Sequence, residues 1–504
     1  MDRHYFIASD RATTAAIPRT GRSDPSAGER RQRILDYPDT KPTGGTVYYI
    51  SPAGDDANAG DSPAQAWRTL GGYEAHLAQV QAGDSLLFER GGIYRGHVSL
   101  RTGVFYGAYG QGEKPRIYGS PRNYNAPEDW QPTDRPGVWR CADTFPQDVG
   151  SIFFDGGRQV GVKKLHTLDA VQSDYDFYHD PADGSLYLCL AQSPAARHRE
   201  IELGVAMCIL SVGGAVHDIV MENLCVQYCG AHAIAFSDGA HAITVRGCVV
   251  AWIGGCLQNP GVNDVRFGNG IQFWNACADI CIEDCWVYQI YDAGLTHQGG
   301  GGRVENVTYR RNLVEYCVYA FELFLGGDEG MHHIRYEDNI LRFSGYGWGK
   351  QRPDPQAESL LCAWGAPFTA EDFVVQRNTF DQSRHWLVVN YQQAPTPIVY
   401  RENIWYQTAD PAGKEMLDSL YGENPWYKTS DGVYRGGKNR QDAAGGENPC
   451  YDKENAAYRG GVARWQGEAV LTADSQETFE EQVRKLDAAP RAIQFGTEFS
   501  EKER

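Results

Sequence analysis

Ile219-Val-Met-Glu-Asn223 is the first of seven similar segments that occupy the middle of this 504-residue chain. Each segment alternates apolar and polar residues and carries an Asn, Asp or Gly at one fixed place. The other six are Ile243-Thr-Val-Arg-Gly247, Ile280-Cys-Ile-Glu-Asp284, Val307-Thr-Tyr-Arg-Arg-Asn312, Ile334-Arg-Tyr-Glu-Asp-Asn339, Phe373-Val-Val-Gln-Arg-Asn378 and Ile398-Val-Tyr-Arg-Glu-Asn403. Alternating strands with a period of about 20 to 50 residues are typical of a solenoid. Because Asn tolerates a left-handed backbone and can bond neighbours above and below, we expect a stacked Asn column at one tight turn.

Two of the intervals between successive anchors are longer than the rest. The anchors Gly247 and Asp284 are 37 residues apart, and Asn339 and Asn378 are 39 apart, whereas the other intervals are 24 to 28 residues. Insertions into a solenoid map to loops on one face, which is often the binding face. The two long intervals therefore predict where functional loops leave the coil.

The bulk composition limits the classes of function. A net charge of −18 argues against nucleic acid and against an anionic membrane surface as partners. No apolar stretch approaches the roughly 18 residues that a transmembrane helix needs. The N-terminus has no apolar segment of signal-peptide length, so we expect a cytoplasmic protein. The oligomeric state cannot be predicted from the sequence.

Thirteen cysteines, many of them in the repeats, fit a reducing compartment. Cys248 and Cys285 directly follow two of the anchors, as small buried side chains inside a coil would. A zinc site at Cys277-x3-Cys281-x3-Cys285 is the alternative interpretation, but these thiols would not converge in a strand–turn–strand repeat. We therefore expect neither a metal nor another cofactor.

The chain divides into five parts by composition and pattern. Residues 1–45 are polar and Arg-rich and are expected to form an arm, while 46–120 form a cap and the first turns of the coil. Residues 121–205 do not follow the repeat and are expected to form an inserted antiparallel β region. The main coil covers 206–410, and 411–504 form a C-terminal extension that loses the repeat.

Four motifs near the start of the coil carry a resemblance to a known group of proteins. They are Tyr48-Tyr-Ile-Ser-Pro-Ala-Gly-Asp-Asp56, Ala66-Trp-Arg-Thr-Leu70, Gly83-Asp-x-Leu-Leu-Phe-x-Arg-Gly-Gly92 and Tyr106-Gly-Ala-Tyr-Gly-x-Gly-x-Lys-Pro115. This run resembles the opening of bacterial right-handed parallel β-helix proteins, the pectate-lyase-like group. The resemblance implies an all-β, right-handed parallel β-helix with an N-terminal capping helix and an inserted β-hairpin region. Many such proteins act on carbohydrates, and the insertion makes the chain most similar to bacterial β-helix glycoside hydrolases.

The strands that precede the anchor segments predict the working face. Alternate residues of a strand point to opposite sides, so if Ile271, Leu295 and Phe321 point inward, Gln272, Thr296 and Glu322 form an outward column. The opposite register would bury Glu322 as an unpaired charge, which costs several kcal/mol. Trp274 would stand beside this column. An aromatic face for the sugar ring and amides for its hydroxyls suit a saccharide.

Asp292 and Glu322 are the candidate catalytic residues. Asp292 enters the same face one turn before Glu322, and glycoside hydrolysis requires two carboxyl groups. One protonates the leaving oxygen, and the other attacks the anomeric carbon or activates water. Retaining and inverting outcomes both remain open. The two long loops would rise on either side of this pair, with Trp348, Lys350 and Arg266 placed to grip an oligosaccharide.

His297 completes the set of candidate substrate-binding residues, after Gln272, Trp274 and the loop residues. The function that we expect is cleavage of a terminal sugar from an oligosaccharide. A polysaccharide lyase acting on uronate-containing glycans is the alternative, since Arg266 and Lys350 could neutralise a substrate carboxylate. It is weakened because no Lys occurs between Leu165 and Gly349. A non-catalytic carbohydrate-binding β-helix is the third possibility.

Overall fold

The computed structural model describes most of the chain from Ser23 onward. The described residues are 23–326, 330–352, 358–365, 369–383, 386–390, 398–401 and 404–406, with the short strands β38 (Tyr427–Lys428), β39 (Tyr434–Arg435), β40 (Cys450–Asp452), β41 (Ala457–Arg459) and β42 (Ala469–Val470). The predicted anchor Asn403 and most of the 411–504 extension lie outside these residues. Among the described residues, no helix has the length and hydropathy to cross a bilayer.

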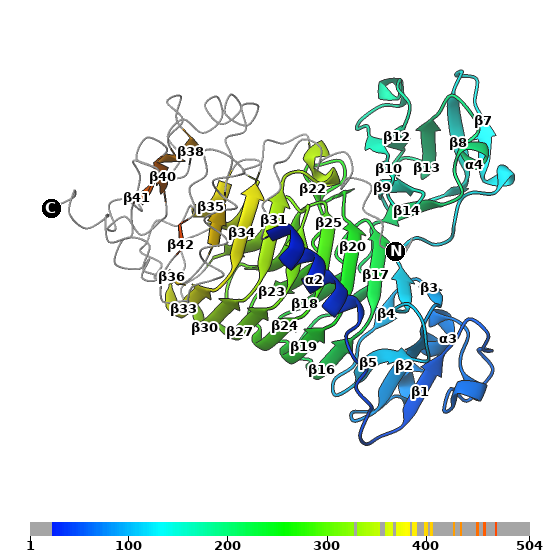
Figure 1. The fold of residues 1–504 in the computed structure, drawn as a ribbon. Helices are drawn as coiled ribbons and strands as arrows, with labels where there is room; N and C mark the ends of the chain where they lie inside the picture. Colours follow the sequence, from blue (N-terminus) through cyan, green and yellow to red (C-terminus); the bar gives the residue numbers. More distant parts are fainter. Residues whose placement is uncertain are drawn as a thin grey trace.

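Three sheets of parallel strands form the body of the molecule (Figure 1). Sheet 1 contains β1 (Val47–Ile50), β2 (Ser85–Glu89), β5 (Phe105–Tyr109), β16 (His217–Glu222), β19 (His241–Arg246), β24 (Ala278–Glu283), β27 (Val304–Arg310), β30 (Met331–Glu337), β33 (Ala370–Gln376) and β36 (Ile398–Arg401). Sheet 2 contains β3 (Ile93–Arg95), β6 (Arg116–Tyr118), β17 (Cys225–Cys229), β20 (Val249–Ile253), β25 (Trp286–Ile290), β28 (Leu313–Glu315), β31 (Ile340–Ser344), β34 (Thr379–Ser383), β37 (Ile404–Tyr406) and β42. Sheet 3 contains β4 (Val98–Ser99), β15 (Leu210–Val212), β18 (Ile234–Ser237), β23 (Ile271–Trp274), β26 (Ala293–Gly299), β29 (Tyr319–Leu325), β32 (Ser359–Gly365) and β35 (Trp386–Asn390).

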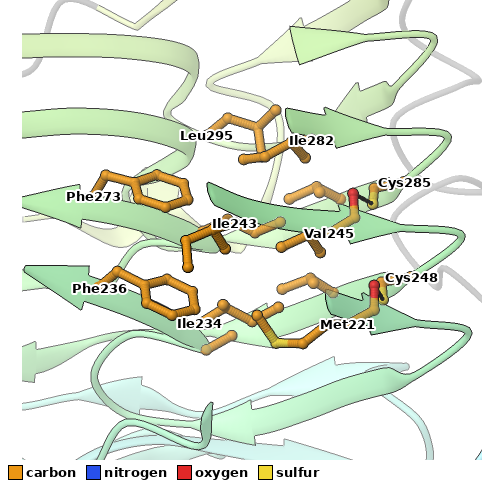
Figure 2. Packing of buried hydrophobic residues seen from close by; sticks show 14 of the residues in the cluster. Met221, Ile234, Phe236, Ile243, Val245, Cys248, Phe273, Ile282, Cys285 and Leu295 are labelled. Carbon is orange, nitrogen blue, oxygen red and sulfur yellow. Dashed lines mark hydrogen bonds between the residues drawn. The ribbon is translucent and has the colours of Figure 1, made fainter. Parts of the chain in front are cut away.

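From β2 to β35, each turn of the coil contributes one strand to sheet 1, then one to sheet 2, then one to sheet 3. Neighbours within a sheet come from successive turns and pair in parallel, as in Ile243 opposite Ile280 and Ile280 opposite Val307. The chain is therefore a parallel β-helix, as predicted. Its core is a single apolar column inside the three sheets, in which Phe236 stacks on Phe273 with ring centroids 5.5 Å apart (Figure 2).

The N-terminal end of the coil is closed by the short helix α3 (Leu70–Ala75), followed by a 3₁₀ turn at Leu77–Gln79. The Thr69 side chain caps α3 by accepting a hydrogen bond from the Gly72 amide. Leu70 and Tyr73 are buried in the same cluster as the first strands. The predicted capping helix is thus present where the open end of a solenoid exposes its core.

The predicted Asn column exists, but the sequence places its first members wrongly. Strand register aligns Asn223, Gly247 and Asp284 with Arg311, Asp338 and Arg377 in later turns. All six have left-handed backbone, with φ between 49° and 61°. The buried column is the next residue in each turn. From the second of these turns onward it reads Cys248, Cys285, Asn312, Asn339 and Asn378.

The asparagines of this column bond one another through the coil. The Asn339 carboxamide oxygen accepts from both the backbone and side-chain nitrogens of Asn312, at 3.0 Å each. The Asn339 side-chain nitrogen donates to the Tyr309 carbonyl at 2.8 Å and to Asn378 at 2.9 Å. Cys248 and Cys285 occupy the same column lower in the coil, and their thiols donate to main-chain carbonyls (Figure 2).

Replacing Asn339 by Ala should lower the free energy of unfolding by about 2–3 kcal/mol, because each buried partner left unsatisfied costs about 1–3 kcal/mol. The midpoint of urea unfolding measures the change. Asn259→Ala, at an exposed loop position, is the matched control and should leave the midpoint unchanged. Equal midpoints for the two variants would show that the column adds nothing to stability.

The helix α2 (Ser23–Leu35) lies across the outer face of sheet 2 (Figure 1). Its Ala27 and Ile34 are buried against outward aromatic residues of the sheet such as Trp286. Arg31 donates to Glu315 at 2.8 Å and places its guanidinium over the Trp286 ring. This part of the expected arm therefore packs along the coil.

The inserted region forms a small β domain beside the coil (Figure 1). Its strands are β7 (Trp130–Pro132), β8 (Val138–Thr144), β9 (Val149–Phe154), β10 (Gln159–Val160), β11 (Val162–Lys163), β12 (Asp176–His179), β13 (Ser185–Cys189) and β14 (Ile201–Val205), with the helical turn α4 (Pro194–Arg197). All of their pairings are antiparallel except that of β11 with β12. A cluster of its own, which includes Phe177 and Leu203, forms the core of this domain.

All three long interruptions leave the coil at one corner, between sheet 2 and sheet 3. The inserted domain lies between β6 and β15. The hairpin of β21 (Cys256–Leu257) and β22 (Arg266–Phe267) lies between β20 and β23, and the 345–358 segment lies between β31 and β32. We call this edge the sheet 2–3 corner. Asp292 lies on the same corner, between β25 and β26.

Candidate active site

The outer face of sheet 3 carries the predicted polar column. Ile271, Leu295 and Phe321 are fully buried in the core of the coil, so the alternate residues point outward. Strand pairing places Gln272 beside Thr296 and Thr296 beside Glu322. We expected Glu322 to point outward because an unpaired glutamate inside the core would be costly. The structure has this register.

Glu322 is enclosed by partners from the same face. Its carboxylate accepts from the Thr296 hydroxyl at 3.0 Å and from the Gln298 side-chain nitrogen at 2.6 Å. The residue is only 2% exposed. Hydrogen-bonding side chains therefore fix the position of this carboxyl group, and Gln298, which is half-buried, links it to the surface.

Asp292 forms an ion pair with Arg352 across the sheet 2–3 corner. The two side chains are 2.7 Å apart and 14% and 7% exposed, respectively. Arg352 follows the short helical turn Trp348–Gln351 in the 345–358 loop, and its guanidinium also lies near the Tyr291 ring. An arginine at this distance stabilises the ionised form of the Asp292 carboxyl group.

The two candidate acids have two neighbours in common. Burial raises the pKa of the Cys362 thiol well above its usual value, and the charges of Glu322 and Asp292 raise it further. Burial likewise raises the pKa of Tyr319, whose charged neighbours include Arg352 as well as both acids. Asp292 directly precedes Ala293, which pairs with Tyr319, and Glu322 follows Tyr319 by three residues on the same strand, so both acids lie on this side of the coil.

A hydrogen-bonded chain that the sequence analysis missed continues the site along the corner. The His232 ring Nδ1 accepts from the Asn269 amide at 3.0 Å, and the Asn269 side chain donates to Gln272 at 2.7 Å and accepts from the Ala293 amide at 3.0 Å. Burial lowers the pKa of His232 to about 4. His232 and Asn269 each stand two residues before the first core residue of a sheet 3 strand. That repeated position was the signal available in the sequence.

A partly open strip borders Glu322. Trp274, Gln298 and Phe324 are paired across three neighbouring strands of sheet 3. Trp274 is half-buried and Phe324 is 39% exposed. An aromatic ring, an amide and a second aromatic ring in line present the flat apolar faces and hydrogen-bonding groups that suit a sugar.

Two of the predicted binding residues have structural contacts instead. Arg266 is buried, donates to the carbonyls of Gly255 and Gly150 at 2.6 and 2.8 Å, and stacks over Tyr291. Trp348 is 5% exposed, donates from its indole nitrogen to the Gln289 carbonyl at 2.8 Å, and packs edge-on against Phe153 of the inserted domain. Both tie the corner loops to the inserted domain, so neither side chain is placed to contact a substrate.

His297 lies inside the coil, on the opposite side of β26 from Thr296. Its ring is fully buried and stacks on Phe273, and burial lowers its pKa to about 3. This position takes His297 out of the site. Lys350 is exposed on the 345–358 loop. Among the described residues, no group of three or more His, Cys, Asp or Glu side chains could hold a metal ion.

Comparison with known proteins gives only distant similarities. No family model matches the sequence, and no curated protein matches it. Among solved structures, a protein titled glycoside hydrolase is similar with 10% identity and a TM-score of 0.41, over 72% of this chain and 92% of that one. A lacto-N-biosidase from Eubacterium ramulus is similar with 16% identity and a TM-score of 0.36, over 76% and 57%. An exopolygalacturonase from Yersinia enterocolitica is similar with 11% identity and a TM-score of 0.36, over 72% and 66%. At these levels, the similarities identify neither a reaction nor a substrate.

Proposed function

We propose that this protein is a glycoside hydrolase that removes a terminal sugar from an oligosaccharide. The observation that carries the proposal is that two carboxyl groups, Asp292 and Glu322, act on the same two side chains, Tyr319 and Cys362, while Glu322 is hydrogen-bonded to Gln298 of the strip. Hydrolysis of a glycosidic bond typically uses a pair of carboxyl groups that flank the bond. The strip supplies the surface on which the sugar rings would lie.

The surroundings of the two acids favour different roles. Asp292 is paired with Arg352 and is therefore suited to act ionised, as the nucleophile or as the base that activates water. Glu322 is almost fully buried, and burial disfavours a charged carboxylate. The hydrogen bonds from Thr296 and Gln298 favour the charged form, but both donors are neutral and offset burial less than Arg352 does at Asp292. Glu322 is thus the better candidate for the general acid that protonates the leaving oxygen.

The charge distribution favours hydrolysis over elimination. A uronate lyase needs a cation to neutralise the substrate carboxylate, but the outward residues of β23 and β26 are Gln272, Trp274, Thr296 and Gln298. Arg352 is already paired with Asp292, and Arg266 is buried against main-chain carbonyls. The neutral strip fits an uncharged saccharide better than a polyuronate.

A product screen tests the proposal directly. The protein is incubated with a panel of neutral aryl glycosides and with uronate polymers, and released aglycone and the ultraviolet absorbance of unsaturated sugars are both recorded. We expect aglycone release from at least one aryl glycoside and no unsaturated product. Unsaturated product from a uronate polymer would replace hydrolysis by elimination, and binding without turnover would make the coil a carbohydrate-binding scaffold.

A further inference from the structure

A cleft of about 550 Å³ lies between the inserted domain and the β21–β22 hairpin. One wall comes from the inserted domain and includes Leu165, His166 and Tyr178. The other wall comes from the hairpin and includes Leu257, Val262, Asn263 and Asp264. The volume is within the range of about 300–1,000 Å³ that small-molecule sites occupy. No residue of the proposed active site lines this cleft.

The floor of the cleft is a fixed ionic cluster. Asp148 pairs with Lys163 at 2.5 Å, has His179 at 3.3 Å, and accepts from the Leu257 amide at 2.8 Å. Lys163, His179 and Asp148 are all buried or nearly so. The cluster joins the inserted domain to the hairpin, so the two walls are held at a defined separation.

The two lysines that line the cleft are each paired with a carboxylate. Lys163 is paired with Asp148, and Lys164 is 3.0 Å from Asp176. His166 is 3.0 Å from Asp264 at the mouth. An anionic ligand would have to displace Asp148 or Asp176 from its lysine, whereas an uncharged polar ligand would not. The cleft therefore favours a neutral ligand over an anionic one.

The remaining surface combines apolar side chains with polar groups at the rim. Val262 is 81% exposed at the hairpin tip, although valine is usually buried. Across the cleft, Leu165 and Tyr178 line the wall of the inserted domain, and Tyr178 is 7% exposed. Asn263 and His166 are exposed at the rim and can hydrogen-bond a ligand. Apolar faces with a rim of hydrogen-bonding groups match the two faces and the hydroxyl edge of a sugar.

We propose that this cleft is a second carbohydrate-binding site, which takes a neutral mono- or disaccharide unit. The choice of a sugar as the ligand rests on the proposed function. The cleft lies on the sheet 2–3 corner, as Asp292 does, and Arg266 of the hairpin stacks over Tyr291 directly before Asp292 in the chain. A glycan held here would thus lie on the same corner of the coil as Asp292.

A fluorescent label in the cleft tests this proposal. The full chain carrying Asp292→Asn and Glu322→Gln, which should not consume the probes, is labelled at Val262→Cys, and the matched control is labelled at Ile93→Cys, where Ile93 is 40% exposed on the coil. The probes are cellobiose, lactose and xylobiose as neutral disaccharides, and digalacturonate as an acidic one. We expect at least one neutral disaccharide to give a saturable emission change at position 262 and none at position 93. Leu165→Trp, which fills the cleft, should weaken this binding at least tenfold.

The outcomes separate this proposal from the proposed function. A response at position 262 that Leu165→Trp leaves unchanged, no response to any neutral disaccharide, or tighter binding of digalacturonate would each overturn the second site. Aglycone release by the unmodified protein is measured separately. Hydrolysis without a response in the cleft removes only the second site, and a response without hydrolysis removes only the enzymatic proposal.

Discussion

Asp292→Asn and Glu322→Gln should each lower kcat/KM for the best aryl glycoside by about 10²- to 10⁴-fold, the usual contribution of a positioned acid or base. Both substitutions keep the shape of the side chain and remove only its capacity to ionise. The Gln298 and Thr296 contacts of Glu322 can persist in part. Asp292→Asn leaves Arg352 without its counter-charge, so the urea midpoint of each variant is measured beside its activity to separate lost chemistry from lost stability. Initial rates of aglycone release measure the loss of activity.

Leaving-group dependence distinguishes the two roles. If Glu322 is the acid, Glu322→Gln should lose much less activity on a dinitrophenyl glycoside, whose aglycone leaves without protonation, than on a phenyl glycoside. Asp292→Asn should lose activity on both. Asp279→Asn, at an exposed carboxylate on the opposite side of the coil, is the matched control and should retain full activity. Full activity in both site variants would place the chemistry elsewhere on a correctly assigned fold.

The fold could be predicted from the sequence because the repeat depends on a local property, the alternation of apolar and polar residues. Apolar residues at alternate positions must face inward in every turn, so the strands and their stacking follow from the sequence. The column was misaligned by one residue because Arg311, Asp338 and Arg377 hold the left-handed position that Asn223 and its neighbours hold in the first turns. Asn is enriched at positive φ and Arg is not. The sequence pattern therefore assigned the left-handed position to the Asn rather than to the residue before it.

The site could be predicted only in part, because some of its residues are placed by long-range packing. The outward direction of Thr296 and Glu322 follows from the alternation of residues along a strand. The same alternation places His297 inside the coil, so its assignment to the site was inconsistent with the predicted register. Trp348 and Arg266 could not be placed by pattern at all. Their partners, Phe153 and Gly150, lie more than 100 residues earlier in the inserted domain. Such long-range packing leaves no local trace in either segment.

Glu315→Gln should lower the free energy of unfolding by about 3–5 kcal/mol, the usual cost of breaking a buried ion pair on one side. Glu315 is 1% exposed and accepts from Arg31 of α2, from the Trp286 indole and from Arg342 of the next turn. The substitution leaves Arg342, itself 5% exposed, without its counter-charge. It also removes a link between α2 and the coil. The urea midpoint, followed by tryptophan fluorescence, measures the loss.

The pH dependence of stability gives an independent measure of the same pair. Burial would raise the pKa of Glu315, but Arg342 and Arg31 outweigh it and lower the pKa from 4.5 to about 2. A carboxyl group with a depressed folded-state pKa adds stability that is fully present above its unfolded pKa and is lost as pH falls toward the folded value. The contribution of Glu315 should therefore hold above about pH 4.5 and disappear towards pH 2.

Glu315→Gln should accordingly be less stable than the unmodified protein at pH 7, and the difference between the two should shrink as the pH falls from about 4.5 to 2. Glu128→Gln is the control, because Glu128 is exposed, and it should match the unmodified protein at every pH. A constant difference for Glu315→Gln across this range would assign its effect to lost packing or hydrogen bonds. A difference that closes in acid assigns it to the charge that holds α2 and two turns of the coil together.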